Sequence, residues 1–195
     1  MVSPHPPSPP GKLRIIGGSL RGSRIAVPDF PGLRPTPDRV RETLFNWLAP
    51  VIEGAKCLDL FAGTGALGIE ALSRGAAQVD FVEADVRLAH LLRENLARLK
   101  QTAQVHADSA DRFLARTPLR YGLVFLDPPF AANVWGDVAR TLEARGLLHE
   151  SAWIYVESPA GAAPELPPNW KMTGPGLRAC LKKRVGVIFM RVGGA

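Results

Sequence analysis

Hydrophobic positions follow two alternating spacings from residue 56 onward. Short, nearly continuous apolar runs, typical of buried strands, are followed by segments with apolar residues every three or four positions, typical of helices. The expected strands are Lys56–Leu60, Gln78–Glu83, Gln104–His106, Leu123–Leu126, Trp153–Glu157 and Val185–Met190. The expected helices are Leu67–Ser73, Val86–Leu99, Ala110–Ala115 and Val134–Ala144, and residues 158–168 are expected to form a loop.

This alternation predicts the fold class. Strands that alternate with helices are the signature of an α/β protein with a mostly parallel sheet and helices on both faces. Connections between its parallel strands are right-handed, and ligands bind at the carboxyl ends of the strands. The candidate acids described below all lie at such ends.

Residues 1–50 follow a different pattern. The first eleven residues are rich in Pro, which predicts a disordered tail. Lys12–Ile16 and Ser23–Val27 are strand-like runs joined by a glycine-rich segment, which predicts a small β-hairpin.

A helix is expected after the hairpin. Thr36 is suited to be its N-cap and Pro37 its first helical residue, and the helical spacing of apolar residues stops at Pro50. The chain then divides into a tail over residues 1–11, a hairpin-and-helix extension over residues 12–50 and an α/β domain over residues 51–195.

The charge is unevenly distributed along the 195 residues, whose net charge is +6. Residues 1–41 carry a net charge of +5 and residues 171–195 one of +6, whereas residues 42–170 carry −5. Basic ends suit polyanion binding, because Lys and Arg neutralise phosphates and release counterions, although a solvated surface is the alternative. The candidates for phosphate contacts are Arg14, Arg21, Arg24, Arg34, Arg39, Arg41, Lys182 and Lys183.

The two cysteines, Cys57 and Cys180, lie far apart and have no metal-ligand spacing, which favours a reduced compartment without a bound metal. The sequence has no apolar run of membrane-spanning length and no signal-peptide pattern at its N-terminus. We therefore expect a cytoplasmic protein with no membrane partner.

Asp127-Pro128-Pro129-Phe130 directly follows an expected strand. Two successive prolines restrict φ and leave no backbone N–H, which predicts a stiff corner rich in acceptors. The Asp127 carboxylate and the Pro128 carbonyl can bind both N–H groups of an exocyclic base amine and so direct its lone pair at an electrophile, while Phe130 stacks on the base. The alternative is a plain turn in which Asp127 is a cap.

A glycine-rich turn follows the strand that ends in Asp59 and Leu60. Gly63 and Gly65 allow the backbone to approach a ligand closely. With Gly68 they also match the G-x-G-x-x-G spacing of NAD-binding proteins. Asp59 argues against NAD, because its charge repels a pyrophosphate but attracts the ammonium of an amino-acid cofactor.

Two further acids end the next expected strands. Glu83 is suited to bind both hydroxyls of a ribose, or else is a helix-start acid beside the cap Asp85. Asp108 is suited to contact an adenine amine, or else is an N-cap. Together with Asp59 and Asp127, these acids indicate S-adenosylmethionine next to a base amine.

The sequence resembles the RsmD family of bacterial 16S rRNA guanine-N2 methyltransferases from about Leu13 to the last expected strand. The resemblance rests on Arg14–Gly18, Leu33–Thr36 with Asp38–Leu48, Asp59–Arg74 and Asp127–Phe130. The first two blocks are more particular to this family than the glycine loop, which all class I methyltransferases share. The chain departs from the family pattern where Asp108-Ser109 replaces a single polar position and in its more basic tail.

The resemblance implies a seven-stranded Rossmann-like sheet and S-adenosylmethionine as methyl donor. It implies the exocyclic N2 of guanine 966 of 16S rRNA as target, within the small ribosomal subunit or a late assembly intermediate. We expect a monomer. The expected catalytic residues are Asp127, Pro128, Pro129 and Phe130, and the expected cofactor-binding residues are Asp59, Phe61, Ala62, Gly63, Gly65, Glu83, Ala84, Asp108 and Ser109.

Three alternatives remain open at the level of the sequence. An adenine-N6 methyltransferase on DNA or RNA is one, because the same corner serves either amine. An NAD-linked oxidoreductase would use the three glycines on a pyrophosphate. A non-catalytic RNA-binding module would show salt-sensitive RNA binding without cofactor affinity.

Overall fold

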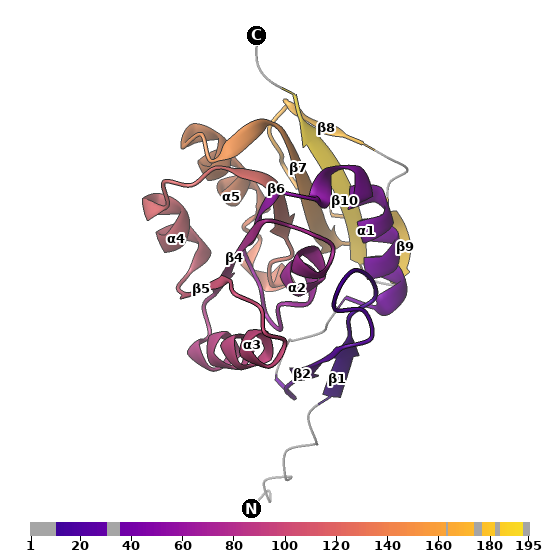
Figure 1. Ribbon diagram of the computed structural model, residues 1–195. Coiled ribbons are helices and arrows are strands. Elements are labelled where there is room, and N and C mark those ends of the chain that lie inside the picture. Colours follow the sequence, from indigo (N-terminus) through magenta and orange to yellow (C-terminus); the bar gives the residue numbers. More distant parts are fainter. Residues whose placement is uncertain (1–10, 31–35, 163, 174–176, 182–183, 193–195) are drawn as a thin grey trace, which may run out of the picture.

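The structure is a computed structural model that describes residues 11–30, 36–162, 164–173, 177–181 and 184–192, so Arg34, Lys182 and Lys183 lie outside the described residues. Its centre is a sheet of eight strands (Figure 1). Seven follow one another in the order β5-β4-β3-β6-β7-β10-β8, and β9 pairs with β10. The strands are β3 (Lys56–Asp59), β4 (Gln78–Glu83), β5 (Gln104–Ala107), β6 (Tyr121–Leu126), β7 (Leu148–Pro159), β8 (Trp170–Met172), β9 (Leu177–Leu181) and β10 (Arg184–Arg191).

The strand directions confirm the predicted α/β class with a mostly parallel sheet. Parallel pairings join β5, β4, β3, β6 and β7, whereas β10 runs antiparallel to β7, β8 and β9. From β3 the chain continues to β4 and β5 on one side and then returns to β6 on the other side of β3. Such a topological switch point is where open α/β sheets bind ligands. Asp59 ends β3 and Asp127 directly follows β6, so both acids flank it.

Helices cover both faces of the sheet (Figure 1). α1 (Asp38–Ile52), α2 (Ala66–Ser73) and α3 (Val86–Arg98) pack on one hydrophobic core, and α4 (Ala110–Arg116) and α5 (Trp135–Ala144) pack on another. Successive strand residues point to opposite faces, so β6 gives Leu123 and Phe125 to the first core and Val124 and Leu126 to the second.

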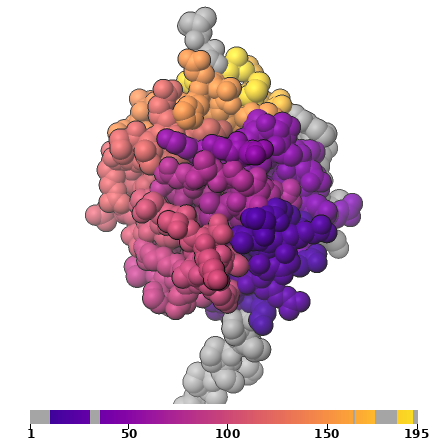
Figure 2. All heavy atoms as spheres, viewed as in Figure 1, coloured from indigo at the N-terminus to yellow at the C-terminus, as the bar shows by residue number. Residues whose placement is uncertain are grey.

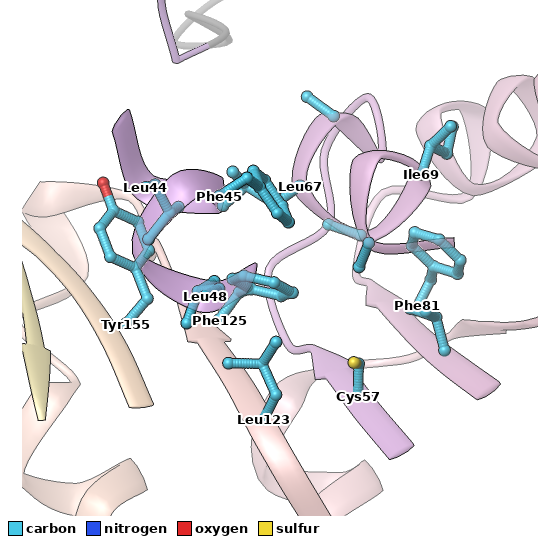
Figure 3. Close-up of a cluster of buried hydrophobic side chains, with 14 of the residues drawn as sticks. Leu44, Phe45, Leu48, Cys57, Leu67, Ile69, Phe81, Leu123, Phe125 and Tyr155 are labelled. Atoms are coloured by element: carbon cyan, nitrogen blue, oxygen red, sulfur yellow. The ribbon is translucent and has the colours of Figure 1, made fainter. Parts of the chain in front are cut away.

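Helix α1 is anchored in the first core by Leu44, Phe45 and Leu48, none of which is exposed (Figure 3). The Phe45 ring lies 5.8 Å, centroid to centroid, from the ring of Phe125 in β6. This contact connects the N-terminal extension to the strand that leads to Asp127.

The predicted N-terminal hairpin is confirmed as an antiparallel pair, β1 (Gly11–Arg14) and β2 (Arg24–Val27). Ile25 of the hairpin is fully buried in the first core. The Asn95 side chain of α3 accepts from the Ala26 N–H at 3.0 Å and donates to the Ala26 carbonyl at 3.2 Å. The hairpin therefore packs directly on the domain, and Figure 2 shows it in indigo as part of one continuous surface.

Two predictions about α1 are wrong. Pro37 is its N-cap, and the Thr36 hydroxyl, expected to cap the helix, instead donates to Oε2 of Glu157 at 3.4 Å. The helix also runs past Pro50 to Ile52. Pro50 lies in the last turn and has no N–H, so one helical hydrogen bond is missing there. The burial of Ile52, which is 3% exposed, offsets the loss of this bond.

The C-terminal part contains more strand than predicted. β7 begins at Leu148 rather than Trp153 and ends at Pro159, inside the expected loop. β8 and β9 have three and five residues and were not predicted, because such short strands show little periodicity. They form by pairing with β10.

Candidate active site

Three of the candidate acids lie at neighbouring strand ends. Asp59 is the last residue of β3 and is aligned with Phe125 of β6, and Asp127 follows two residues later. Glu83 is the last residue of β4, aligned with Ala107 of β5. Since these strands are parallel, the acids share one edge of the sheet, as predicted.

The turn between β3 and α2 contains two glycines with positive φ, +53° at Gly63 and +78° at Gly65. A Cβ on Gly65 would lie 2.3 Å from Cδ1 of Leu92, and a Cβ on Gly68 would lie 2.2 Å from Cε1 of Phe81. Backbone conformation and close packing thus account for these glycines. Their G-x-G-x-x-G spacing therefore needs no dinucleotide to explain it.

Three more residues predicted to bind the cofactor lie in this loop or directly after β4. Ala62 is 7% exposed, and its N–H donates to the Val82 carbonyl at 2.9 Å, which joins the loop to β4. Phe61 is half-buried, and Ala84, which follows the end of β4, is exposed. The exposed and half-buried members are therefore the ones accessible to a ligand.

The Asp59 carboxylate is buried at the start of this loop. Its residue is 3% exposed, and Oδ2 accepts the Gly68 N–H at 2.9 Å. Burial raises the pKa of Asp59 to about 7; the Gly68 hydrogen bond opposes this rise, and the negative charge of Glu83 adds to it. A carboxylate in this position is best stabilised by a cationic group.

Glu83 holds the glycine turn from the adjacent strand. Its Oε2 accepts the Gly63 N–H and its Oε1 accepts the Asp85 N–H, both at 2.8 Å. Asp85 is the N-cap of α3 and accepts from the N–H groups of Arg87 and Leu88. Glu83 is thus fixed at the mouth of the loop, and the capping role belongs to Asp85.

Asp108 and Ser109 follow β5 beside Glu83. The Asp108 N–H donates to the Glu83 carbonyl at 3.1 Å, and its Oδ2 pairs with Arg116 at 2.9 Å. The N-cap of α4 is Ser109, so the alternative in which Asp108 caps this helix is wrong. The ion pair holds the Asp108 carboxylate in place at the end of β5.

The Asp-Pro-Pro-Phe corner follows directly after β6. Asp127 is half-buried, Pro128 buried and Pro129 exposed, and Phe130 begins the short helix η1 (Phe130–Ala132). The Pro129 carbonyl accepts the Ala132 N–H at 2.9 Å. The centroid of the Phe130 ring lies 6.1 Å from that of Trp135, the first residue of α5. The corner is therefore in contact with α5.

Most described members of the basic set have exposed side chains. Arg14, Arg21, Arg24 and Arg39 are exposed, and the first three belong to the hairpin or its connecting turn. Arg41 is the exception, and its predicted role in phosphate contacts is wrong. It is fully buried in α1, where it donates to the carbonyls of Thr36 and Arg14 and to the carboxylates of Asp38 and Glu70.

Comparison with known proteins identifies the family of this chain. Residues 13–175 match the model of a family described as conserved hypothetical protein 95. The ribosomal RNA small subunit methyltransferase D of Escherichia coli K12 is 51% identical over 164 residues, 83% of both chains. Its namesake in Haemophilus influenzae is 43% identical over 85% of this chain and 89% of its own. The chain belongs to the RsmD family.

A solved structure supports the same assignment for this RsmD-family chain. The putative methyltransferase yhhF from Escherichia coli superposes with a TM-score of 0.85 at 43% identity, covering 94% of this chain and all of its own. The chain is therefore a methyltransferase of the RsmD family, whose relatives methylate ribosomal RNA.

Within the described residues, no helix is long and apolar enough to cross a membrane.

Sequence reasoning about this RsmD-family chain missed one important residue, Glu70. It is the only charged residue of α2 and is fully buried. Its carboxylate accepts the N–H groups of Ile16 and Gly17 at 2.8 Å and pairs with Arg41 and Arg74. Glu70 thus connects the hairpin, α1 and α2. The available signal was a lone acid in an otherwise apolar helix.

Proposed function

We propose that this protein transfers a methyl group from S-adenosylmethionine to the exocyclic N2 of a guanine, of the guanine 966 type, in 16S rRNA of the small ribosomal subunit. One observation carries the proposal: the Asp127-Pro128 corner and the Asp59 loop flank the same switch point of the sheet. The names of the relatives support ribosomal RNA of the small subunit as substrate.

The residues around the glycine turn fit S-adenosylmethionine, which would supply an electrophilic methyl group on a sulfonium when bound. Asp59 is buried and its pKa is raised, so it gains from an ammonium placed beside it. Glu83 lies at the end of β4, where a carboxylate accepts from ribose hydroxyls. Asp108 or Ser109 contacts the adenine. Two carboxylates around the turn disfavour the pyrophosphate of NAD.

The corner residues orient the target amine. Asp127 and the Pro128 carbonyl accept its two N–H groups, which directs the nitrogen lone pair away from the ring plane. Phe130 stacks on the base and is itself braced by Trp135. Since the amine of guanine is delocalised, positioning carries most of the rate enhancement. Asp127 or solvent takes the proton that the methylated nitrogen loses.

The guanine must be unstacked from its neighbours to reach this corner. Unstacking costs the least free energy when the guanine lies in an RNA loop.

Methyl transfer from labelled S-adenosylmethionine to small subunits from cells lacking this protein tests the proposal. We expect N2-methylguanosine at a single site. Asp127→Ala should lower turnover at least about a hundredfold, because it removes an acceptor that acts on the reacting amine, while cofactor affinity stays unchanged.

Two outcomes contradict the proposal. Near-normal turnover of Asp127→Ala refutes the role of this carboxylate. The appearance of N6-methyladenosine, or no incorporation despite measured cofactor binding, refutes the guanine target.

A further inference from the structure

A hollow of about 280 Å³ lies on the surface between the hairpin and α3. The two elements are neighbours in Figure 1 and contact each other through β2. The described residues that line the hollow are Gly11, Lys12, Arg24, Ile25, Ala26 and Arg98. Three of these are cationic and exposed, and none is acidic.

One of the three cations, Arg98, is held in place by hydrogen bonds. Nη2 of Arg98 donates to the Arg24 carbonyl at 2.9 Å and to Oδ1 of Asn95 at 2.7 Å. Asn95 is 1% exposed and itself bonds both backbone groups of Ala26. A guanidinium carries five N–H donors, so Arg98 can make these bonds and still bind an anion. The Arg98 guanidinium is therefore preorganised at the rim of the hollow.

The remaining lining residues suit a sugar–phosphate unit. Gly11 and Ala26 are small, and Ile25 is buried, so the backbone there can be approached closely. The hollow thus has room for a phosphate beside the cations and for a sugar against the small residues. Charge complementarity commits the site to an anionic occupant.

We propose that this hollow binds a phosphate of the RNA backbone at a distance from the reacting nucleotide. The inference rests on the proposed function. Helix α3 begins just after Glu83, at the strand ends proposed to bind the cofactor, and has 13 residues, so Arg98 lies about 20 Å from these strand ends. The hairpin and the methyltransferase domain thus hold the same RNA strand together, several nucleotides from the target guanine.

Equilibrium binding of protein-free 16S rRNA, measured over a range of salt concentrations without S-adenosylmethionine, tests the inference. Lys12→Ala and Arg98→Ala should each weaken binding several-fold and lower the slope of log affinity against log salt by about one, since each removes one phosphate contact. Arg98→Lys retains the charge and should restore most of the slope. Arg140→Ala is the matched control, because it removes one exposed Arg of α5, on the opposite face of the sheet.

Turnover gives a second readout. Lys12→Ala should raise KM for the RNA and leave kcat and the Kd for S-adenosylmethionine unchanged. Slopes equal to that of Arg140→Ala overturn the inference. The inference is also overturned if the variants bind intact small subunits more weakly but bind protein-free rRNA as the wild type does. That result would indicate an acidic ribosomal protein as the occupant of the hollow.

The binding assay needs no methyl transfer, so failure of the proposed reaction is seen separately. Wild-type protein that binds RNA through the hollow but methylates nothing refutes the reaction and supports the site. If the protein methylates RNA but Lys12→Ala and Arg98→Ala both keep the salt dependence of the wild type, the reaction is supported and the site is refuted.

Discussion

At the scale of single residues, Asp59 links stability to ligand binding. The ordinary pKa of an aspartate is 3.8, and burial raises that of Asp59 to about 7. Between these values the folded protein holds a proton that the unfolded chain has released, so a rise in pH through this window lowers the free energy of unfolding. The stabilisation is complete below the lower value and lost above about pH 7. At higher pH the folded apo protein contains an unfavourable buried charge.

Replacing Asp59 with Asn should therefore stabilise the apo protein above pH 7, by up to a few kcal/mol, because each unit of pKa shift corresponds to about 1.4 kcal/mol. The amide oxygen can still accept the Gly68 N–H. The same change should weaken S-adenosylmethionine binding at least about tenfold, because the partner of its ammonium is lost.

Denaturant titrations from pH 4 to pH 8 and calorimetric titration of the cofactor measure both effects. The stability difference between the two proteins should grow between pH 4 and 7 and then stay constant. A difference independent of pH would contradict the assigned pKa.

The roles of single residues were only partly predictable from the sequence. Asp59, Glu83 and Asp127 lie at the predicted edge because each follows an apolar run whose direction the α/β pattern determines. Arg41 was misassigned because its partner Glu70 lies in a different helix. The packing of α1 against α2 and against the hairpin, whose Arg14 carbonyl it also bonds, makes this arginine a buried residue.

At the scale of elements, α2 lies so close to β4 that it has no room for a side chain at one position just after the glycine turn. Gly68 lies in the first turn of α2, where any side chain would meet the ring of Phe81. The strands that surround this turn were predicted because they are buried apolar runs. The short edge strands were not, because they depend on a partner strand rather than on their own pattern.

Gly68→Ala should destabilise the protein by about 1–3 kcal/mol, the usual cost of overpacking a core. Gly122→Ala in β6 is the control, because its Cβ would meet nothing closer than 3.8 Å. Thermal unfolding of both variants measures the difference. Equal melting temperatures would mean that α2 can shift away from β4 at no cost.

At the scale of the whole molecule, Glu70 joins the basic hairpin to the catalytic domain. Its carboxylate accepts two backbone N–H groups on the hairpin side and pairs with Arg41 of α1 and with Arg74, the C-cap of α2. A buried carboxylate with this many partners is stabilising only as a complete set, since the loss of one member leaves others unpaired.

Glu70→Gln should lower the free energy of unfolding by about 3 kcal/mol, because Arg41 then remains buried with less compensation. It should also speed amide exchange at Ile16 and Gly17. Glu94→Gln removes an exposed acid of α3, whose side chain is 61% exposed, and should cost less than about 1 kcal/mol. Urea unfolding and hydrogen exchange provide the two measurements, and equal effects of both variants would refute the linking role.

Side chains of α3, rather than a third strand, close the outer edge of β2. Asn95 bonds the N–H and the carbonyl of Ala26, and Arg98 bonds the carbonyl of Arg24 two residues away. Open strand edges recruit strands from other chains and so start aggregation. Because these backbone groups are already bonded, the hairpin resists strand addition by neighbouring copies. The short basic hairpin can therefore stay exposed at high protein concentration without starting aggregation.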